Sequence, residues 1–232
     1  MSIKENLNVI NAKITEAAIK SGRSPKDITL VGVTKTIEVA QIRECMFGNL
    51  LVFGENKVQE FLPKYEILAQ ETPQPRWHFI GHLQKNKVKF IIDKVDLIHS
   101  VDSLALAAEI NKRAIASNKM ANILAEINIA QESSKFGFSP SQILEFAKNL
   151  ENMQGVRLKG FMCVPPFVEN PEENRQFFIK MRNLLLDIKE KGLYHIDLQE
   201  LSMGMSGDYG VAVEEGATMV RVGTSLFGSR II

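Results

Sequence analysis

The sequence predicts an α/β fold, a single-domain (β/α)8 TIM barrel that covers residues 1–232. Two observations predict it: eight short apolar runs follow one another along the chain, and helical patterns separate them. No linker composition, repeat or low-complexity tract divides the chain. Strands that alternate with helices over this length are typical of a closed barrel. An open, doubly wound sheet is the alternative, because periodicity alone does not distinguish the two.

An extra helix is expected before the first strand. Ile3, Leu7, Ile10, Ile14 and Ala17 recur at helical spacing, which predicts one buried stripe. The eight apolar runs are rich in β-branched residues and too short for helices, so we expect strands that are buried on both faces. They lie at residues 28–33, 51–53, 77–80, 97–98, 123–129, 158–164, 197–201 and 218–222.

Three of the intervening helices have recognisable starts. Ser103 precedes the Ala/Leu-rich stretch 104–115. Ser139 and Gln142 form a capping-box pattern, with a proline at the first helical position, where its missing N–H costs nothing. Residues 170–173, Asn-Pro-Glu-Glu, open another helix with acidic side chains near the positive end of its dipole.

Charge and cysteine content exclude several classes of protein. The formal net charge is +1, which leaves no basic footprint for nucleic acid. Cys45 and Cys163 are far apart and form no CxxC motif, which argues against a disulfide framework and fits a reducing compartment. Charged residues interrupt the N-terminal segment, and no run approaches the roughly 18 apolar residues of a membrane span. We therefore expect a soluble, cytoplasmic protein with no nucleic-acid or membrane partner.

The histidines do not have the spacing of metal ligands. His78 and His82 are separated by the end of a predicted strand, so they do not share one helix face. We expect His78 in the strand, His82 in the loop, and no metal site.

The functional residues of a barrel lie at the carboxyl ends of its strands and in the loops that follow. Lys35 comes directly after the first predicted strand. Partial desolvation there would lower the pKa of its amine and make it a nucleophile that forms Schiff bases. The alternative is a solvated lysine that opens the next helix, and position alone favours this alternative.

The loops after the last two strands are typical of a phosphate site. They read Ser-Met-Gly-Met-Ser-Gly at 202–207 and Val-Gly-Thr-Ser-Leu-Phe at 222–227. Glycines let backbone N–H groups approach an anion, hydroxyls add donors, and a helix start at Thr224 adds its dipole. Ordinary turn chemistry explains the same residues equally well. Neither loop is a Walker-type motif.

Six motifs then follow one another along the chain. They are Val-Thr-Lys-Thr at 33–36, Gly-Glu-Asn-Lys-Val-Gln-Glu at 54–60, Trp-His-Phe-Ile-Gly-His-Leu-Gln-Lys-Asn-Lys at 77–87, Ser-Lys-Phe-Gly at 134–137, Leu-Ser-Met-Gly-Met-Ser at 201–206 and Met-Val-Arg-Val-Gly-Thr at 219–224. In this order they resemble the pyridoxal phosphate homeostasis proteins, whose single domain is similar to the N-terminal barrel of alanine racemase. One departure is Ile37-Glu38, where many relatives place a proline.

The resemblance implies a barrel of PLP fold type III in which Lys35 carries pyridoxal 5′-phosphate (PLP) as a Schiff base. It implies that Asn56 and Met203 lie near the cofactor ring. It also implies that four residues surround the phosphate: Ser202, Ser206, Gly223 and Thr224.

Two further residues gain a role from the resemblance. Arg221 matches the arginine that faces the pyridine nitrogen, and an arginine can only donate hydrogen bonds. It therefore disfavours protonation of the ring and weakens carbanion chemistry. Lys135 matches a second lysine of the family, which we expect near the cofactor mouth with a role in exchange. The alternative is a solvated loop lysine.

The expected function is a PLP-binding protein of PLP homeostasis, not an enzyme. The chain stops at Ile232 soon after the last strand, without the second domain from which alanine racemases supply a catalytic tyrosine. We therefore expect a monomer that stores PLP, or delivers it to apo PLP-dependent enzymes, without significant turnover. One alternative is a slow PLP-dependent amino-acid racemase that uses Lys35 with Tyr209 or His82. Another is a Schiff-base aldolase that acts on a phosphorylated sugar.

Overall fold

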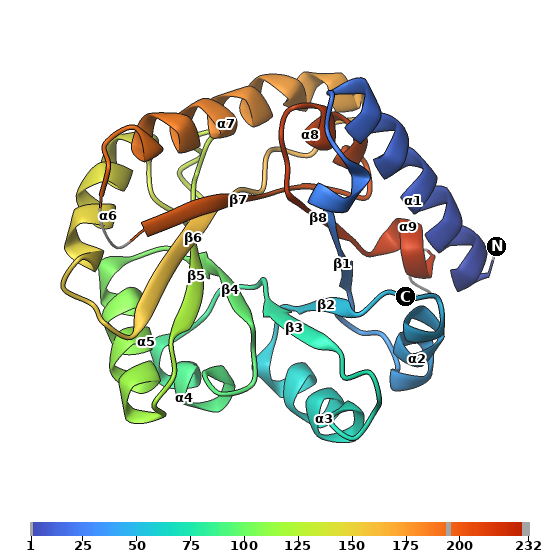
Figure 1. Ribbon diagram of the computed structural model, residues 1–232, viewed down its shortest axis with the longest axis horizontal. Helices are drawn as coiled ribbons and strands as arrows, with labels where there is room; N and C mark the ends of the chain where they lie inside the picture. The colour runs from blue at the N-terminus through green and yellow to red at the C-terminus, as the bar shows by residue number, and fades with distance from the viewer. Residues whose placement is uncertain (1, 194–195, 229–232) are drawn as a thin grey trace.

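The strands follow one another around a barrel, as the apolar runs predict. The computed structural model describes residues 2–193 and 196–228. In these residues eight parallel strands close in sequence order, and the first pairs with the last (Figure 1). The strands are β1 (Thr29–Val33), β2 (Val52–Glu55), β3 (Arg76–Phe79), β4 (Leu97–Val101), β5 (Ala121–Glu126), β6 (Val156–Met162), β7 (Ile196–Met205) and β8 (Met219–Val222).

Helices surround this barrel (Figure 1). The α-helices are α1 (Ile3–Lys20), α2 (Val39–Phe47), α3 (Val58–Leu68), α4 (Val88–Ile91), α5 (Leu104–Ala116), α6 (Ile143–Leu150), α7 (Arg175–Lys189), α8 (Tyr209–Glu214) and α9 (Thr224–Phe227). Short 3-10 segments are η1 (Pro25–Asp27), η2 (Lys85–Lys87), η3 (Pro140–Gln142) and η4 (Pro171–Asn174). The closed barrel is thus confirmed over the open sheet.

Helix α1 is the extra N-terminal helix that the periodicity predicts. All five residues of the predicted stripe are buried. A capping box fixes its start: Ser2 Oγ accepts from Glu5 N at 3.2 Å, and the Glu5 carboxylate accepts from Ser2 N at 2.7 Å. The Asn6 amide donates to Leu226 O at 2.9 Å, which fastens α1 to α9 beside the end of β8.

The predicted helix starts are confirmed, with one difference. Ser103 caps α5 by accepting a hydrogen bond from Leu106 N. The Ser139–Gln142 capping box and Asn170 open the 3-10 segments η3 and η4, which then continue into α6 and α7. Both segments carry proline in their first turn, and tighter 3-10 turns are common at helix termini.

The barrel strands carry an apolar cluster and, next to it in register, a set of buried polar side chains. Five residues from different strands form an inner apolar cluster: Val31, Leu97, Leu124, Met162 and Met219. A larger core lies between the strands and the helices. Three of four buried polar side chains pair in register with members of the inner apolar cluster, and the four are His78, His99, Ser202 and Arg221. Polar side chains therefore lie within the barrel strands as well as in the loops.

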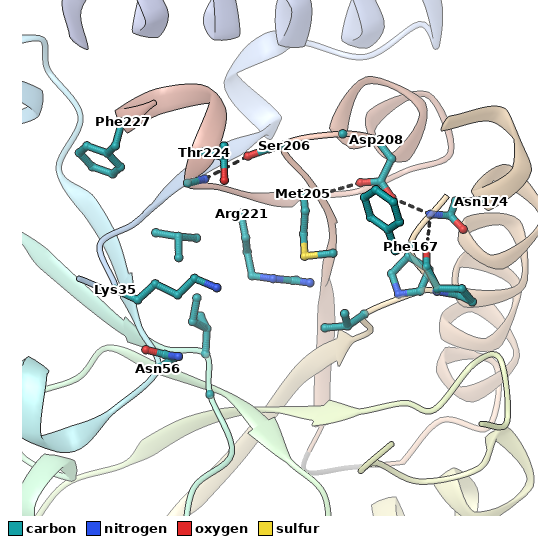
Figure 2. Close-up of a pocket in the computed structure, with 18 of the residues that line it drawn as sticks. Lys35, Asn56, Phe167, Asn174, Met205, Ser206, Asp208, Arg221, Thr224 and Phe227 are labelled. Atoms are coloured by element: carbon teal, nitrogen blue, oxygen red, sulfur yellow. Dashed lines mark hydrogen bonds between the residues drawn. The ribbon is translucent and has the colours of Figure 1, made fainter. Parts of the chain in front are cut away.

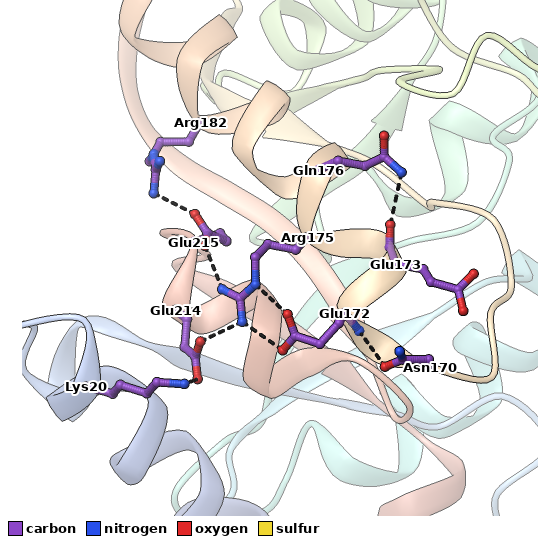
Figure 3. A network of polar contacts seen from close by, with 9 residues as sticks. All are labelled: Lys20, Asn170, Glu172, Glu173, Arg175, Gln176, Arg182, Glu214 and Glu215. Carbon is purple, nitrogen blue, oxygen red and sulfur yellow. Dashed lines mark hydrogen bonds and ion pairs between the residues drawn. The ribbon is translucent and has the colours of Figure 1, made fainter.

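A network of ion pairs holds α1, α7 and α8 together (Figure 3). Arg175 pairs with Glu172, Glu214 and Glu215 at 2.6–2.8 Å. Lys20 of α1 pairs with Glu214 at 2.7 Å, and Arg182 pairs with Glu215 at 2.8 Å. Exposed pairs contribute little singly, but a network with shared partners contributes more. Because α8 follows the loop at 206–208, the network supports one wall of the site described below.

Membrane spans, metal sites and disulfides were considered from the sequence, and the structure bears on each of them. Within residues 2–193 and 196–228, no helix has the length and apolarity needed to cross a membrane. The same residues contain no group of three or more His, Cys, Asp or Glu side chains suited to a metal ion. Cys45 and Cys163 are both buried and form no disulfide.

Candidate functional site

A cavity of about 680 Å³ opens at the carboxyl ends of the strands. Its walls come from the loops after β1, β2, β3, β5, β6, β7 and β8, and Arg221 of β8 also lines it. Lys35 extends into this cavity from the end of β1, toward Arg221 (Figure 2). The architecture therefore brings Lys35 and the loops of the last two strands to one pocket.

The backbone on each side of Lys35 is held by hydrogen bonds. Lys64 Nζ donates to Thr34 O at 2.6 Å, and Thr34 Oγ1 donates to Glu55 Oε1 at 2.7 Å. Thr36 adopts a left-handed φ of 63°, and its N–H donates to Glu60 Oε2 at 2.8 Å. A left-handed threonine is uncommon and persists only where its surroundings hold it. Lys35 is thus placed at a rigid point of the chain.

A buried ion pair lies behind this segment. Lys64 Nζ lies 2.6 Å from Glu55 Oε1, and the two residues are 9% and 0% exposed. A buried carboxylate needs such a partner, because its desolvation is costly. Sequence reasoning missed this pair, since Lys64 has the pattern of an ordinary surface lysine in a helix.

Asn56 lies on the wall next to Lys35, and close backbone packing positions it. A Cβ on Gly81 would lie 2.2 Å from Asn56 O, so the loop after β3 approaches this closely only because residue 81 is glycine. The Oδ1 atom of Asn56 is buried and has no hydrogen-bond partner among the described residues. Because this oxygen is closed to solvent, Asn56 reaches the cavity through other atoms of its side chain and backbone.

The loops after β7 and β8 form a cradle of donors. The N–H groups of Gly223 and Ser225 both donate to Ser206 Oγ, at 3.3 and 3.2 Å. Two backbone N–H groups that converge on one oxygen are the geometry of an anion nest. Thr224 lies between them and lines the same cavity (Figure 2). The cradle therefore fits a phosphate group.

Arg221 lies at the cavity floor and is 5% exposed. Its Nη1 donates to Ser202 Oγ at 2.5 Å, and its Nη2 donates to Cys163 O at 2.8 Å. Burial lowers the pKa of the guanidinium, yet arginine stays protonated in proteins. None of the ion pairs among the described residues includes Arg221. Its positive charge is therefore not neutralised by a direct contact.

Two of the expected residues are not brought to the cavity wall. Ser202 is fully buried beneath Arg221, where it also contacts His99 Nδ1 at 2.9 Å. Met203 points into the core between the barrel and the helices. The reason is that β7 continues to Met205, so both residues lie below the strand end and on alternate faces. Met205 lines the cavity in place of Met203.

The loop after β6 closes the opposite side of the cavity. Phe167 lines the cavity while remaining 95% exposed. Asn174 Nδ2 donates to Pro166 O at 3.1 Å and to Asp208 Oδ2 at 2.8 Å, which ties this loop to the one after β7 (Figure 2). Sequence reasoning missed this tie, although a buried asparagine at a helix start is a recognisable signal.

Of the three remaining candidate residues, one lines the cavity and two do not. Lys135 lines the cavity, with its Nζ 2.6 Å from Glu132 Oε1 and 3.3 Å from Val164 O. His82 lies in a loop, as expected, where its Nδ1 is 3.1 Å from Asp102 Oδ2 and its ring stacks on Phe136. Tyr209 is buried, and burial raises the pKa of its hydroxyl. Neither His82 nor Tyr209 is among the described residues that line the cavity.

Comparison with known proteins gives the family. The family model of the alanine racemase N-terminal domain matches residues 3–231. A pyridoxal phosphate homeostasis protein of Aquifex aeolicus is 44% identical over 230 residues, 99% of this chain and 99% of its own. The chain belongs to the pyridoxal phosphate homeostasis protein family.

Two other relatives agree with this assignment. A member of the family from Pseudomonas aeruginosa is 38% identical, covering 99% of this chain and 96% of its own. The structure of PipY of Synechococcus elongatus with PLP bound is 32% identical and has a TM-score of 0.85. It covers 98% of this chain and 100% of that one. The resemblance inferred from the six motifs is thus confirmed at the level of family and fold.

Proposed function

We propose that this protein binds PLP as a Schiff base on Lys35 and holds it for storage or delivery, without significant turnover. The observation that carries the proposal is that Lys35 and the donor cradle of Ser206, Gly223 and Thr224 open into one cavity (Figure 2). Bound PLP supplies an aldehyde, which a primary amine captures, and a pyridine ring, which withdraws electrons. Relatives named for PLP homeostasis and PipY with PLP bound support the same ligand.

Each part of the cavity has a group that matches one part of PLP. The hydroxyls of Ser206 and Thr224 donate to the phosphate, and the N–H groups of Gly223 and Ser225 hold the Ser206 hydroxyl in place for this contact. Asn56 lies beside the ring, and Arg221 donates to the pyridine nitrogen. Ser202 supports Arg221 from below instead of contacting the phosphate.

The side chains around the cavity favour a carrier over an enzyme. Racemisation needs two acid/base groups, and each such group typically contributes roughly 10²–10⁴-fold to the rate. Lys35 would serve one face of a substrate, whereas His82 and Tyr209 are not among the described residues of the cavity wall. Arg221, which only donates, keeps the ring nitrogen unprotonated and so weakens carbanion chemistry.

The expected setting is the cytoplasm, where the protein acts as a monomer and passes PLP to apo-enzymes. Both cysteines are buried, and burial raises the pKa of each thiol to about 12. Thiols of this kind stay protonated and unreactive, which suits a reducing compartment. Phe167 and Val164, which line the cavity, expose apolar surface there.

Reduction with borohydride tests the proposal directly. The purified protein is incubated with PLP, reduced, digested and analysed by mass spectrometry, with Lys35→Ala as the matched control. We expect a yellow protein whose absorbance is lost on reduction and whose added mass lies on the peptide that contains Lys35. An adduct mainly on another lysine would contradict the assignment, and no adduct would point to the aldolase alternative. L-Alanine racemisation far above the rate of free PLP would favour the racemase.

A further inference from the structure

A chain of hydrogen bonds runs from Arg221 into the closed interior of the barrel. Arg221 Nη1 donates to Ser202 Oγ at 2.5 Å, and Ser202 Oγ lies 2.9 Å from His99 Nδ1. His99 Nε2 lies 2.9 Å from His78 Nδ1. The four residues come from β8, β7, β4 and β3, and none is more than 5% exposed. Nothing in the proposed contacts with PLP uses the two histidines.

Both histidines are neutral at physiological pH. Burial lowers the pKa of His78 to about 3, with Arg76 contributing. Burial also lowers the pKa of His99 well below its usual value, with His78 and Arg221 acting in the same direction. A neutral imidazole has one nitrogen that donates and one that accepts. Each imidazole therefore accepts a hydrogen bond at one nitrogen and donates one from the other.

The direction of the whole chain follows from Arg221. An arginine has no acceptor, so Ser202 Oγ accepts from it. If His99 Nδ1 also donated to Ser202, the buried hydroxyl would have two donors and no protein acceptor for its own proton. A buried donor without an acceptor is costly. Ser202 therefore donates to His99 Nδ1, His99 Nε2 donates to His78 Nδ1, and His78 carries its proton on Nε2.

We infer that His99 is a positioning residue for Arg221: it accepts the Ser202 proton at Nδ1 and so fixes Ser202 as the acceptor for the guanidinium. Cys163 O fixes the other end of the same group at 2.8 Å. The guanidinium is then held at two points by groups of the barrel, and Arg221 lines the cavity beside Lys35 (Figure 2). The Arg221 side of the cavity is thus shaped to bind an aromatic nitrogen with a free lone pair.

This inference deepens the proposed function, because its effect on ligand binding rests on PLP as the ligand. The direction of the chain does not depend on PLP at all. The two parts are therefore tested separately, so that failure of one is distinguishable from failure of the other.

The first test is the tautomeric state of the histidines in the protein without PLP. Histidine is labelled with 15N, and two-bond 1H–15N correlation spectra are recorded between pH 5 and pH 8, with His99→Asn and His78→Gln to assign the signals. We expect His99 and His78 to be Nε2–H tautomers that do not titrate in this range. A His99 protonated on Nδ1, or one that titrates, would overturn the inference whether or not the protein binds PLP.

The second test compares three variants at position 99. Asparagine places a carbonyl oxygen near the position of Nδ1, whereas glutamine places its polar group near Nε2, and leucine offers no acceptor. We expect His99→Leu and His99→Gln to weaken both PLP and pyridoxal by about ten- to a hundredfold. His99→Asn should bind both ligands nearly as well as the unchanged protein.

Equal losses for PLP and pyridoxal are part of the expectation, because Arg221 faces the ring and not the phosphate. A loss of affinity confined to PLP would show that the hydrogen bonds of His99 act on the phosphate cradle, and would overturn the inference. So would an unaffected His99→Leu variant, or an asparagine variant that is folded, as judged by its NMR spectrum, but fails to restore binding. If the unchanged protein binds neither ligand, the proposed function fails. The tautomers of His99 and His78 then still test the direction of the hydrogen bonds.

Discussion

The two cationic side chains of the site are supported in opposite ways. Behind Lys35 lies a charged pair, Glu55 and Lys64, whose opposite charges are in contact at 2.6 Å. The groups that Arg221 contacts, and His99 behind them, are neutral: the Ser202 hydroxyl, the Cys163 carbonyl and the His99 ring, while the carboxylates of Glu126 and Asp208 act on it without direct contact. Both sides are equally closed to water, since Glu55, Ser202 and His99 are each at most 1% exposed.

The difference shows that one group of residues positions the Lys35 segment, while another residue, Arg221, supplies positive charge. The charges of the Glu55–Lys64 pair largely cancel, so the pair fixes the Thr34 backbone while adding little field in the cavity. The charge of Arg221 is not cancelled by a contact, although Glu126 and Asp208 act on it from further away, so Arg221 contributes a positive field at the cavity floor. In a site of low dielectric such a charge favours anions and lone pairs. The residues behind Lys35 thus fix its position, whereas Arg221 acts on a ligand through its charge.

Breaking the charged pair should have the largest effect on stability. Lys64→Met leaves the Glu55 carboxylate buried without a cation, and we expect a loss of about 3–5 kcal/mol in the free energy of unfolding. Adding Glu55→Gln to that variant should recover much of the loss. Ser202→Ala, on the neutral side, should cost only about 1–3 kcal/mol. Urea unfolding of the four proteins measures this, and equal losses for Lys64→Met and Ser202→Ala would remove the contrast.

Acid should act on the arginine side through the histidines. The pKa of His78 is lowered from 6.5 to about 3 in the folded protein, so below pH 6.5 the unfolded chain binds a proton that the folded protein does not. Stability is therefore full above pH 6.5 and falls as pH decreases toward 3. Between pH 7 and pH 5 we expect a loss on the order of 2 kcal/mol from His78, and His99 adds in the same direction.

Urea unfolding at pH 7 and pH 5 measures this loss. His78→Gln, which cannot titrate, is the matched control and should show a clearly smaller difference between the two pH values. A variant with the full pH dependence of the unchanged protein would show that His78 is not the group responsible.

The fold was predictable because its elements are periodic. The stripe of α1 and the short apolar runs identify helix and strands without tertiary information. The strand ends were less predictable: β4 continues through His99 and Ser100 to Val101, and β7 continues to Met205. A run of mainly apolar residues does not indicate how far a strand extends into the polar residues that follow it, whereas the barrel strand continues where polar side chains find partners inside it.

The sequence predicts those site residues that directly follow strand ends. It does not predict which side chains on different strands contact one another. Lys35, Asn56, Ser206, Gly223 and Thr224 follow strand ends, and the structure brings all of them to one cavity. Pairing of His78 with His99, or of Glu55 with Lys64, depends on register and on side-chain direction, which one sequence does not reveal. The place of Ser202 beneath Arg221, away from the cavity wall, depends on the same two features.

The cradle offers a sharper test of the electrostatic side. Ser206→Ala and Thr224→Val each remove one hydroxyl donor to a charged phosphate, and each should weaken PLP binding by about 1.5–3 kcal/mol. Pyridoxal, which has no phosphate, should bind these variants almost as well as the unchanged protein. Ser202→Ala, which acts through Arg221, should weaken both ligands alike. Titration of absorbance with each ligand measures this, and equal losses of PLP and pyridoxal in Thr224→Val would place the phosphate elsewhere.

Lys135 should have the smallest effect, and on rate instead of affinity. Its Nζ contacts Glu132 Oε1 and Val164 O, so it joins the loops after β5 and β6 at the cavity wall. A partly exposed ion pair contributes at most about 1 kcal/mol, so Lys135→Ala should keep the PLP spectrum and slow transfer to an apo-aminotransferase by up to about fivefold. Lys135→Arg keeps the charge and should transfer PLP at nearly the normal rate. Recovery of aminotransferase activity follows the transfer, because only the PLP-loaded enzyme is active. Unchanged kinetics in Lys135→Ala would leave Lys135 as a structural link between two loops, and release of PLP would then depend on Lys35 and the cradle alone.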